Sequence, residues 1–293
     1  MSDVEDIEVE RSDARLAGSL WRPARDPRAL VVMHPGSGPS DRHNDVYFPP
    51  IRTMLLDAGC AVASFDKRGV GGSTGSLGDA SVERQADDLL ACVSALRRHV
   101  RPGLPVGAFG HSQGGWVVYG AAGQRQGLEF AVANSGPGVS VFEQERFASA
   151  ATFREDDQRA DAHRALDVLH ELATTGSPFA EVTRRLESEV SELVRERFRW
   201  LAANEEVWRL TASLLRYDPA PALGSIDVPV LAMFGRDDVV VPVQASVERL
   251  RRLVAPDLLR VAVLPGEHRL LDDLGNLPAD YADTLWHFLG LVA

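Results

Sequence analysis

Apolar residues recur along this chain in runs of four to six positions, interrupted only by Ser64 and Arg260, and most of these runs end in glycine-rich loops. These runs lie at 29–33, 61–65, 106–109, 130–133, 230–234 and 259–264. Such runs are typical of strands that are buried on both faces of a parallel sheet. Segments with helical spacing of apolar residues lie between them, at 49–58, 82–100, 116–124, 244–254 and 279–291. The alternation predicts an α/β fold with a mostly parallel central sheet and helices on both faces.

The two ends of this pattern carry different signals. Residues 1–30 contain candidate strands at 6–10 and 16–21, which predict a short antiparallel start. In parallel sheets of this kind, functional side chains gather at the carboxyl ends of the strands. The loops that follow the apolar runs are therefore the places to search for chemistry.

One interval, 139–217, breaks the alternation because it contains no convincing strand. Its only glycine and proline lie in the Gly-Ser-Pro run 176–178, which indicates a helix end, an N-cap serine and a proline at the first helical position. We expect two long helices around this break and a third at 204–215. The interval predicts a helical cap inserted into a core of residues 1–138 and 218–293.

The run 106–109 leads into Gly110-His111-Ser112-Gln113-Gly114, a Gly-x-Ser-x-Gly sequence followed by a second apolar run. This order predicts a strand, a tight turn and a helix, with Ser112 at the apex. Glycines on both sides let strand and helix approach closely and leave the serine hydroxyl exposed. The pattern alone is a weak indication, and its context decides.

A serine hydroxyl becomes a good nucleophile only when a base takes its proton and an acid orients that base. Two carboxylates, Asp237 and Asp238, follow the apolar run 230–234. His268 follows the last run, in a Pro-Gly-Glu-His sequence. Serine, acid and histidine thus occur in this order at predicted strand ends, as the fold requires.

These motifs together resemble the α/β-hydrolase family over nearly the whole chain. The family often carries its acid in a Gly-x-x-Asp-x-x-Val-Pro loop, which here spans 235–242 and selects Asp238 rather than Asp237. Some members carry the acid after an earlier strand, but the segment 134–138 has none. The resemblance implies a triad of Ser112, His268 and Asp238.

Acyl transfer also needs two backbone donors for the oxyanion. One is the amide of Gln113, the residue after the nucleophile, and the other belongs in the loop 34–42. That loop is similar to the Gly-Ser-Gly-Pro-x-Asp-Arg loop of a bacterial serine-esterase branch, which implies the amide of Ser37, with Gly36 as the alternative. A phosphate-binding loop is disfavoured because no Gly-Lys-Ser/Thr follows.

The loop 66–73 reads Asp-Lys-Arg-Gly-Val-Gly-Gly-Ser and resembles the family's Asp-x-Arg-Gly-x-Gly-x-Ser. The resemblance implies that Asp66 and Arg68 brace the loops near the site. Its glycine spacing does not match a dinucleotide-binding loop. No cluster of residues has metal-ligand spacing, so we expect no cofactor and no metal.

The predicted cap contains aromatic side chains that are candidates for lining a substrate pocket. Each of them has packing of the cap onto the core as its simpler explanation. The candidates are Phe142, Phe147, Phe153, Trp200 and Trp208.

Composition narrows the classes of partner. The formal net charge of −11 argues against binding to nucleic acid or to anionic membranes. The acidic start of the chain has no signal-peptide pattern, and Cys60 and Cys92 lie in apolar segments that favour packing over a disulfide. We therefore expect a cytoplasmic enzyme; the oligomeric state stays open.

The sequence predicts a serine hydrolase that cleaves a carboxylic ester or thioester of a small to medium apolar substrate. The first alternative keeps the fold but changes the outcome, as in an acyltransferase or a cyclase. The second is a ligand-binding protein without catalysis. An intact triad favours hydrolysis.

Overall fold

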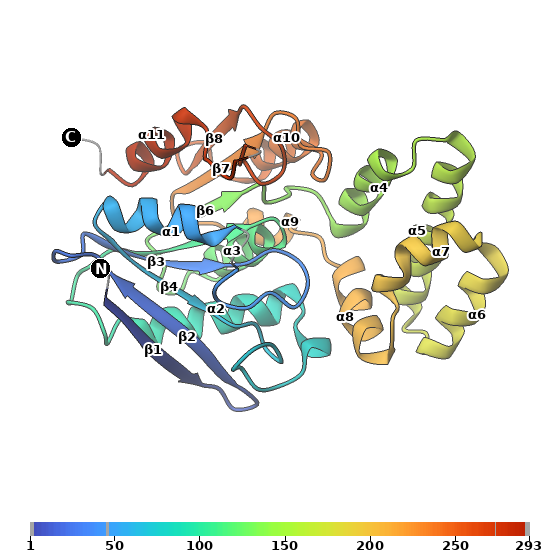
Figure 1. Cartoon of the computed structure of the whole chain (residues 1–293), viewed down its shortest axis with the longest axis horizontal. Helices are drawn as coiled ribbons and strands as arrows, with labels where there is room; N and C mark the ends of the chain where they lie inside the picture. Colours follow the sequence, from blue (N-terminus) through green and yellow to red (C-terminus); the bar gives the residue numbers. More distant parts are fainter. Residues whose placement is uncertain (1–2, 45–46, 273, 291–293) are drawn as a thin grey trace.

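The computed structural model describes residues 3–44, 47–272 and 274–290, and within them eight strands form one sheet (Figure 1). The strands follow the order β1-β2-β4-β3-β5-β6-β7-β8. β1 and β2 form an antiparallel hairpin, β2 is antiparallel to β4, and all other pairs are parallel. The strands are β1 (Asp3–Glu10), β2 (Arg15–Arg22), β3 (Ala29–His34), β4 (Cys60–Phe65), β5 (Val106–His111), β6 (Phe130–Asn134), β7 (Val230–Gly235) and β8 (Leu259–Leu264). The predicted parallel sheet with an antiparallel start is present.

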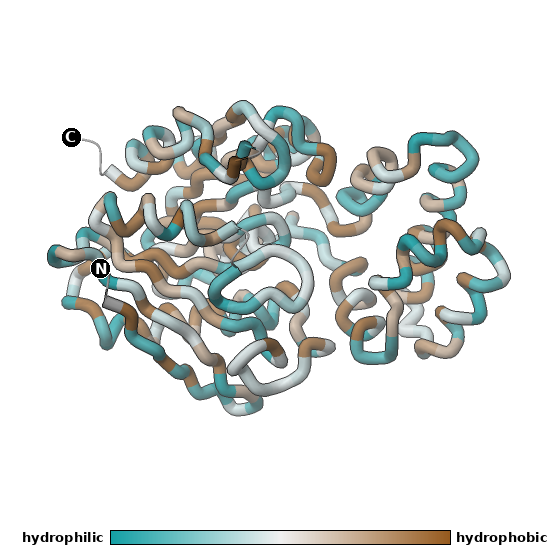
Figure 2. Tube along the Cα trace, in the orientation of Figure 1, coloured by the Kyte–Doolittle hydropathy of each residue, from teal (hydrophilic) through white to brown (hydrophobic). Residues whose placement is uncertain are grey.

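Successive residues of each central strand point into two different cores. In β3, Leu30 and Val32 face one core, whereas Val31 and Met33 face the other. The first core is covered by α2 (Val82–Leu96), α3 (Gln113–Gly123), α9 (Ala220–Leu223) and α10 (Val243–Leu253), and the second by α1 (Phe48–Asp57) and α11 (Ala279–Phe288). Figure 2 shows the hydrophobic residues concentrated along the strands. Burial on both faces explains the apolar runs of the central strands. The expectation of burial on both faces is wrong for β8, which lies at the edge of the sheet and is buried only at its two end residues, with Arg260 exposed.

Between β6 and β7 the chain forms a helical insertion, Val141 to Leu215, which stands at one end of the sheet (Figure 1). It contains five α-helices and a short 3-10 turn rather than the three helices expected. Its elements are α4 (Val141–Thr152), α5 (Asp156–Thr175), α6 (Phe179–Glu189), α7 (Glu192–Phe198), η2 (Arg199–Leu201) and α8 (Glu205–Leu215).

The extra helix boundaries in the insertion are breaks of two to six residues. At Phe153 and at Val190 the backbone becomes extended, yet both side chains stay buried. A break that keeps its apolar side chain in the core leaves the helical periodicity unchanged, so the pattern does not reveal it. The break at Gly176 is where the sequence predicts it, in a left-handed conformation, but Pro178 is the N-cap of α6 rather than its first residue.

Other differences concern the ends of elements. The helix expected at 82–100 ends at Leu96, and the helix expected from 116 begins three residues earlier, at Gln113. α11 ends at Phe288, and the expected residue 291 lies outside the described residues, as do Met1 and Ser2 at the acidic start. No helix among the described residues combines the length and hydropathy that a membrane span needs.

Parallel pairing brings four strand ends to one edge of the sheet. β3 pairs with β5, and β7 pairs with β8, so their carboxyl ends lie next to one another. The loop 34–42 follows β3, Ser112 follows β5, and Asp238 and His268 follow β7 and β8. The topology therefore places every predicted site residue of the core at one edge.

The insertion has an apolar interior of its own, and this makes its stability testable. Leu169 in α5 is completely buried, whereas Leu193 in α7 is 58% exposed. We expect Leu169→Ala to lower the free energy of unfolding by about 2–5 kcal/mol because it leaves a cavity. Leu193→Ala, the same substitution on the surface, is expected to change it by less than about 0.5 kcal/mol. Urea unfolding followed by circular dichroism measures both, and equal effects would contradict the assigned packing.

Candidate active site

Ser112 occupies a strained turn between β5 and α3. Its backbone has φ 54° and ψ −120°, a conformation that costs free energy in a non-glycine residue. A Cβ atom at Gly110 would lie 2.0 Å from the carbonyl oxygen of Gly114, and one at Gly114 would lie 2.5 Å from that of His34. Only glycine permits both approaches. The turn therefore holds the serine side chain out from the strand end.

The structure brings Ser112, His268 and Asp238 together. His268 Nε2 lies 2.9 Å from Ser112 Oγ, and His268 Nδ1 lies 2.8 Å from Asp238 Oδ2. The backbone amides of Val240 and Val241 donate to Asp238 Oδ1 at 2.8 and 2.9 Å. The Asp238 side chain is fully buried, and that of His268 is 17% exposed. A buried carboxylate with three such contacts orients the imidazole toward the serine.

Asp237, the neighbouring carboxylate, points elsewhere. It is exposed, and its backbone amide donates to the carbonyl of Gly266 at 3.0 Å. It is Asp238, not Asp237, that contacts His268.

The two expected oxyanion donors lie beside the serine. Gln113 is the first residue of α3, and amides in the first turn of a helix have no acceptor within that helix. Ser37 lies with Ser112 on the wall of the same cavity, while Gly36 is buried with a Cβ position 3.3 Å from the Cβ of Ser112. The ammonium group of Lys67 donates to the carbonyl oxygens of Gly36 and Gly38.

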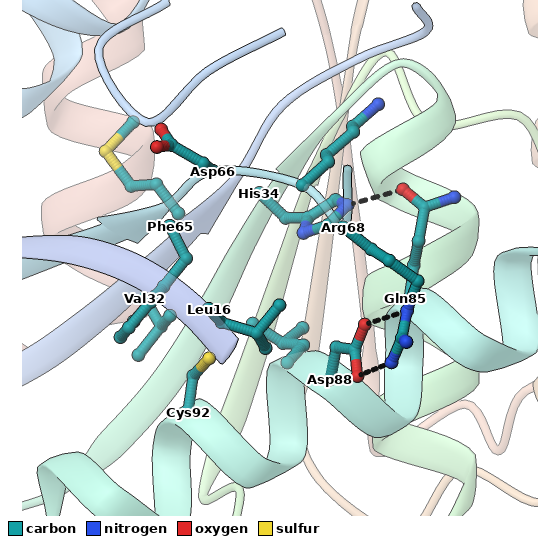
Figure 3. Close-up of a pocket in the computed structure, with 12 residues that line it drawn as sticks. Leu16, Val32, His34, Phe65, Asp66, Arg68, Gln85, Asp88 and Cys92 are labelled. Atoms are coloured by element: carbon teal, nitrogen blue, oxygen red, sulfur yellow. Dashed lines mark hydrogen bonds and ion pairs between the residues drawn. The ribbon is translucent and has the colours of Figure 1, made fainter. Parts of the chain in front are cut away.

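His34 and His111 brace this edge of the sheet. His34 Nε2 lies 3.0 Å from Gln85 Oε1, a contact drawn in Figure 3, and His111 Nδ1 lies 3.3 Å from the carbonyl oxygen of Asn134. Burial, with a smaller effect of the Lys67 charge, lowers the pKa of His34 to about 3. Burial and then His268 lower the pKa of His111 well below its usual value. Both imidazoles are therefore neutral near pH 7.

Asp66 and Arg68 brace neighbouring loops. Asp66 accepts hydrogen bonds from the amides of Arg42 and Gly72, each at 2.7 Å. Arg68 forms a two-pronged ion pair with Asp88, at 3.1 and 2.9 Å (Figure 3). These contacts fix the far end of the loop 34–42 and the glycine-rich loop after β4.

Two cavities meet at the site. An apolar cavity of about 210 Å³ lies between the core and the insertion, and a more open, more polar cleft of about 480 Å³ contains Ser112 itself. Both are lined by Ser37, Gln144, Glu145 and Trp200. Within the described part of the chain, no three histidine, cysteine, aspartate or glutamate side chains are placed to hold a metal ion.

The family model described as serine aminopeptidase, S33 (Hydrolase_4) matches residues 25–274. The chain belongs to the serine aminopeptidase S33 family. As an S33 member it is a serine hydrolase with the α/β-hydrolase fold, so the predicted fold is confirmed. It is also 26% identical over 209 residues to an uncharacterized 31.7 kDa protein of Escherichia coli from the traX-finO intergenic region, which covers 68% of this chain and 69% of that protein.

Solved structures share the whole fold of this S33 protein. The Pyrococcus furiosus esterase Pf2001 superposes with a TM-score of 0.66 at 19% identity, covering 99% of this chain and 90% of that one. A highly thermostable carboxyl esterase from Bacillus coagulans gives a TM-score of 0.67 at 19% identity, covering 100% of both chains. At this identity the likeness extends to the fold alone.

The aromatic residues of the insertion divide into two groups in this S33 member. Trp200 lines both cavities. Phe142, Phe147 and Trp208 are absent from the described residues that line them. Phe142 stacks on His170 at 4.3 Å between ring centroids, Phe147 is 39% exposed, and Trp208 packs inside the insertion and donates to the Ser177 carbonyl. Phe153 is also buried inside the insertion, against Phe198. The helical spacing of apolar residues predicts which face of a helix is buried, but not which part of the structure packs against that face.

Sequence reasoning missed two charged residues that line the cavities. Lys67 occupies the variable position of the Asp-x-Arg-Gly sequence, where no motif assigns it a role. Glu145 lies on α4, and its carboxylate forms no hydrogen bond or ion pair with any residue of 3–44, 47–272 or 274–290. Burial raises the pKa of the Glu145 carboxyl to about 7. Nothing in its sequence neighbourhood distinguishes it from an ordinary surface acid.

The two neighbouring aspartates provide a matched test of the geometry. Asp238→Asn removes the carboxylate that holds His268, so we expect the rate of Ser112 labelling by a fluorophosphonate to fall by about 10³–10⁴-fold. Asp237→Asn makes the same change on the surface and should leave that rate within about threefold. Labelling rates by gel fluorescence decide the matter, and a larger loss in the Asp237 variant would contradict the assignment.

Proposed function

We propose that this S33 protein hydrolyses a carboxylic ester or thioester that carries a small to medium apolar acyl group. The observation that carries the proposal is the hydrogen-bonded series from Ser112 Oγ through His268 to Asp238, with distances of 2.9 and 2.8 Å. The reaction needs no cofactor because all of its proton transfers use these side chains.

In the first half-reaction, Ser112 Oγ attacks the substrate carbonyl carbon while its proton passes to His268 Nε2. Asp238 keeps the proton on Nδ1 and stabilises the imidazolium. The carbonyl oxygen becomes an oxyanion and accepts hydrogen bonds from the amides of Gln113 and Ser37. Ser37 suits this role better than Gly36 because it lines both cavities.

Collapse of the tetrahedral intermediate breaks the bond to the alcohol or thiol, which takes the proton from His268. An acyl group remains on Ser112. Water then loses a proton to His268 and attacks the acyl carbon, and the second tetrahedral intermediate releases the carboxylic acid and restores the serine hydroxyl.

The two cavities support a division of the substrate between them. The apolar cavity adjoins both proposed oxyanion donors and has walls of Trp116, Leu210 and Leu214 among others, which suits the acyl group. Its volume of about 210 Å³ lies below the ~300–1,000 Å³ usual for drug-sized ligands, so the acyl group is short to medium. The open cleft that holds Ser112 suits the leaving group. The helical insertion, which provides Leu210, Leu214 and Trp200, serves as the cap.

A second candidate function is the removal of an N-terminal aminoacyl group, as the family description names. Glu145 favours it, because an unpartnered carboxylate on the wall of both cavities can bind the α-ammonium of such a substrate. A substrate cation beside Glu145 would favour the ionised carboxylate.

A panel of esters and thioesters from acetyl to palmitoyl tests the main proposal. We expect turnover to be greatest for short to medium acyl groups and to fall for long ones, which exceed the apolar cavity. Ser112→Ala should lower kcat by at least about 10³-fold. Mass spectrometry of fluorophosphonate-treated protein should find the label on Ser112.

Product analysis distinguishes hydrolysis from the alternatives. With water and alcohol or amine acceptors in competition, hydrolysis yields the free acid, whereas an acyltransferase yields the acylated acceptor. Retention of full turnover by Ser112→Ala, or labelling of another residue, would refute the proposal. The absence of any acyl-enzyme burst would favour a binding protein.

The second candidate is tested by comparing alanyl and propionyl esters, which differ by one amino group. If Glu145 binds that group, Glu145→Gln lowers kcat/KM for the alanyl ester about 10–100-fold and leaves the propionyl ester within about threefold. The preference for the alanyl ester should rise as Glu145 ionises above about pH 7 and decline above about pH 8, where the α-amine loses its proton. An equal loss for both esters would exclude this role of Glu145.

A further inference from the structure

Lys67 is the only lysine among the 31 lysine and arginine residues of this sequence. It lies directly after β4 between Asp66 and Arg68, and its side chain is buried. An arginine stays protonated under all ordinary conditions, whereas a lysine is a compact charge whose pKa shifts readily on burial. The one position where this chain uses lysine is therefore a position next to the proposed active site.

The partners of Lys67 differ from those of its neighbours. Asp66 and Arg68 both form ion pairs, with Arg42 and Asp88 respectively. Lys67 forms no ion pair with the residues that the structure describes; its ammonium donates instead to the carbonyl oxygens of Gly36 and Gly38, the latter at 3.2 Å. A buried charge without a counter-charge is costly. Here the hydrogen bonds to the carbonyl oxygens of the loop 34–42 offset this cost.

The carbonyl of Gly36 and the N–H of Ser37 belong to the same peptide group. A positive charge bound to that carbonyl draws electron density toward its oxygen, which strengthens the N–H on the other side as a donor. The same bond fixes the orientation of the peptide plane. Lys67 thereby acts on the proposed oxyanion donor without touching the substrate's reacting atoms.

The loop 34–42 needs this contact with Lys67 because the tip of the loop is poorly supported by the rest of the structure. Ser37, Gly38 and Pro39 are exposed, and Gly38 has a left-handed backbone with open space around it. Asp66 holds the far end of the loop at the amide of Arg42. Lys67 lies in the wall of the apolar cavity and contacts the near side of the loop at the carbonyl oxygens of Gly36 and Gly38.

We propose that Lys67 is a positioning residue for acyl transfer: its ammonium group clamps the Gly36 and Gly38 carbonyls and so aligns and polarises the Ser37 amide for the oxyanion. This inference rests on the proposed serine-hydrolase function. It assigns Lys67 an effect on transition-state stabilisation rather than on substrate binding.

Protonation of Lys67 then links activity to pH. Burial lowers the pKa of Lys67 to about 7, so the ammonium loses its proton as pH rises past that value. A neutral amine still donates hydrogen bonds but no longer polarises the peptide group, so activity declines on the alkaline side. The titratable and charged groups lining the cavities beside Lys67 are His34, Asp66, Arg68, Asp88, Cys92 and Glu145.

His34 is neutral near pH 7, and burial raises the pKa of Cys92 well above its usual value. Asp66 and Asp88 form ion pairs with arginines. Glu145 differs from these groups, because its pKa is also about 7. Glu145→Gln therefore serves as the background in which the Lys67 titration is repeated.

Two variants test the clamp by kinetics with the preferred ester. Lys67→Met keeps an unbranched side chain that is one atom shorter, and it removes the charge and the donors. We expect its kcat to fall by about 10–100-fold, in the range below complete loss of an oxyanion donor, with KM within about threefold. Lys67→Arg keeps a charge that does not titrate, so its kcat/KM should lose the alkaline decline of the wild type even where its rate is lower.

A spectroscopic measurement on the wild-type protein does not depend on either variant. Because Lys67 is the only lysine, protein labelled with [¹³Cε,¹⁵Nζ]lysine gives one side-chain signal, whose titration reports its pKa directly. An alkyl trifluoromethyl ketone forms an anionic hemiketal on the catalytic serine. We expect the adduct to raise the Lys67 pKa by at least about one unit, as a nearby opposite charge does. Ser112→Ala, which forms no adduct, should show no rise.

The outcomes separate the inference from the function on which it rests. If no adduct forms on Ser112, the proposed function fails. If the adduct forms but the Lys67 pKa is unchanged, or if Lys67→Met keeps kcat within about twofold, the clamp is overturned while the function stands. A loss confined to KM would likewise overturn it, because a positioning residue for the oxyanion acts on kcat.

Discussion

The close approach of helix α3 to the end of β3 is the contact on which the site depends. At Gly114 a single added carbon would lie 2.5 Å from the carbonyl oxygen of His34, so the helix packs here only because this residue is glycine. The approach brings the loop 34–42 close to Ser112, since a Cβ atom at Gly36 would lie 3.3 Å from the Cβ of Ser112. It also holds Ser112 at a positive φ, a strained conformation that persists because the surrounding contacts over-determine it.

Electrostatics follow from the burial that this packing produces. Desolvation keeps the imidazoles of His34 and His111 neutral, while the Asp238 carboxylate accepts hydrogen bonds from two backbone amides and contacts His268. Lys67 lies in the wall of the apolar cavity, and its ammonium group donates hydrogen bonds to carbonyl oxygens of the loop 34–42. Fixed charges and dipoles act more strongly where water is excluded. The edge of the sheet thus combines neutral imidazoles, hydrogen-bonded carboxylates and two buried basic side chains, Lys67 and Arg68.

Local patterns carried the prediction of the core and of the candidate site residues. The central parallel strands are apolar runs, and Ser112, Asp238 and His268 follow β5, β7 and β8 in chain order. The carboxyl ends of parallel strands lie at the same edge of the sheet, so a residue's place after a strand in the sequence also predicts its place in the fold. No such rule applies to the insertion. The helical spacing of its apolar residues continues through the break at Val190, so the sequence does not reveal that break. Trp208 faces the interior of the insertion rather than a cavity.

By itself the sequence determined the parallel sheet, the turn at Ser112 and the order in which Asp238 and His268 follow it, because these depend on periods and spacings within one or two elements. Only the tertiary structure decided which side chains surround the substrate space. Glu145 on α4 and Lys67 after β4 line one cavity although no pattern links them along the chain. A cavity is the volume that distant elements leave unfilled when they pack. Its walls are therefore a property of the assembled fold and not of any segment.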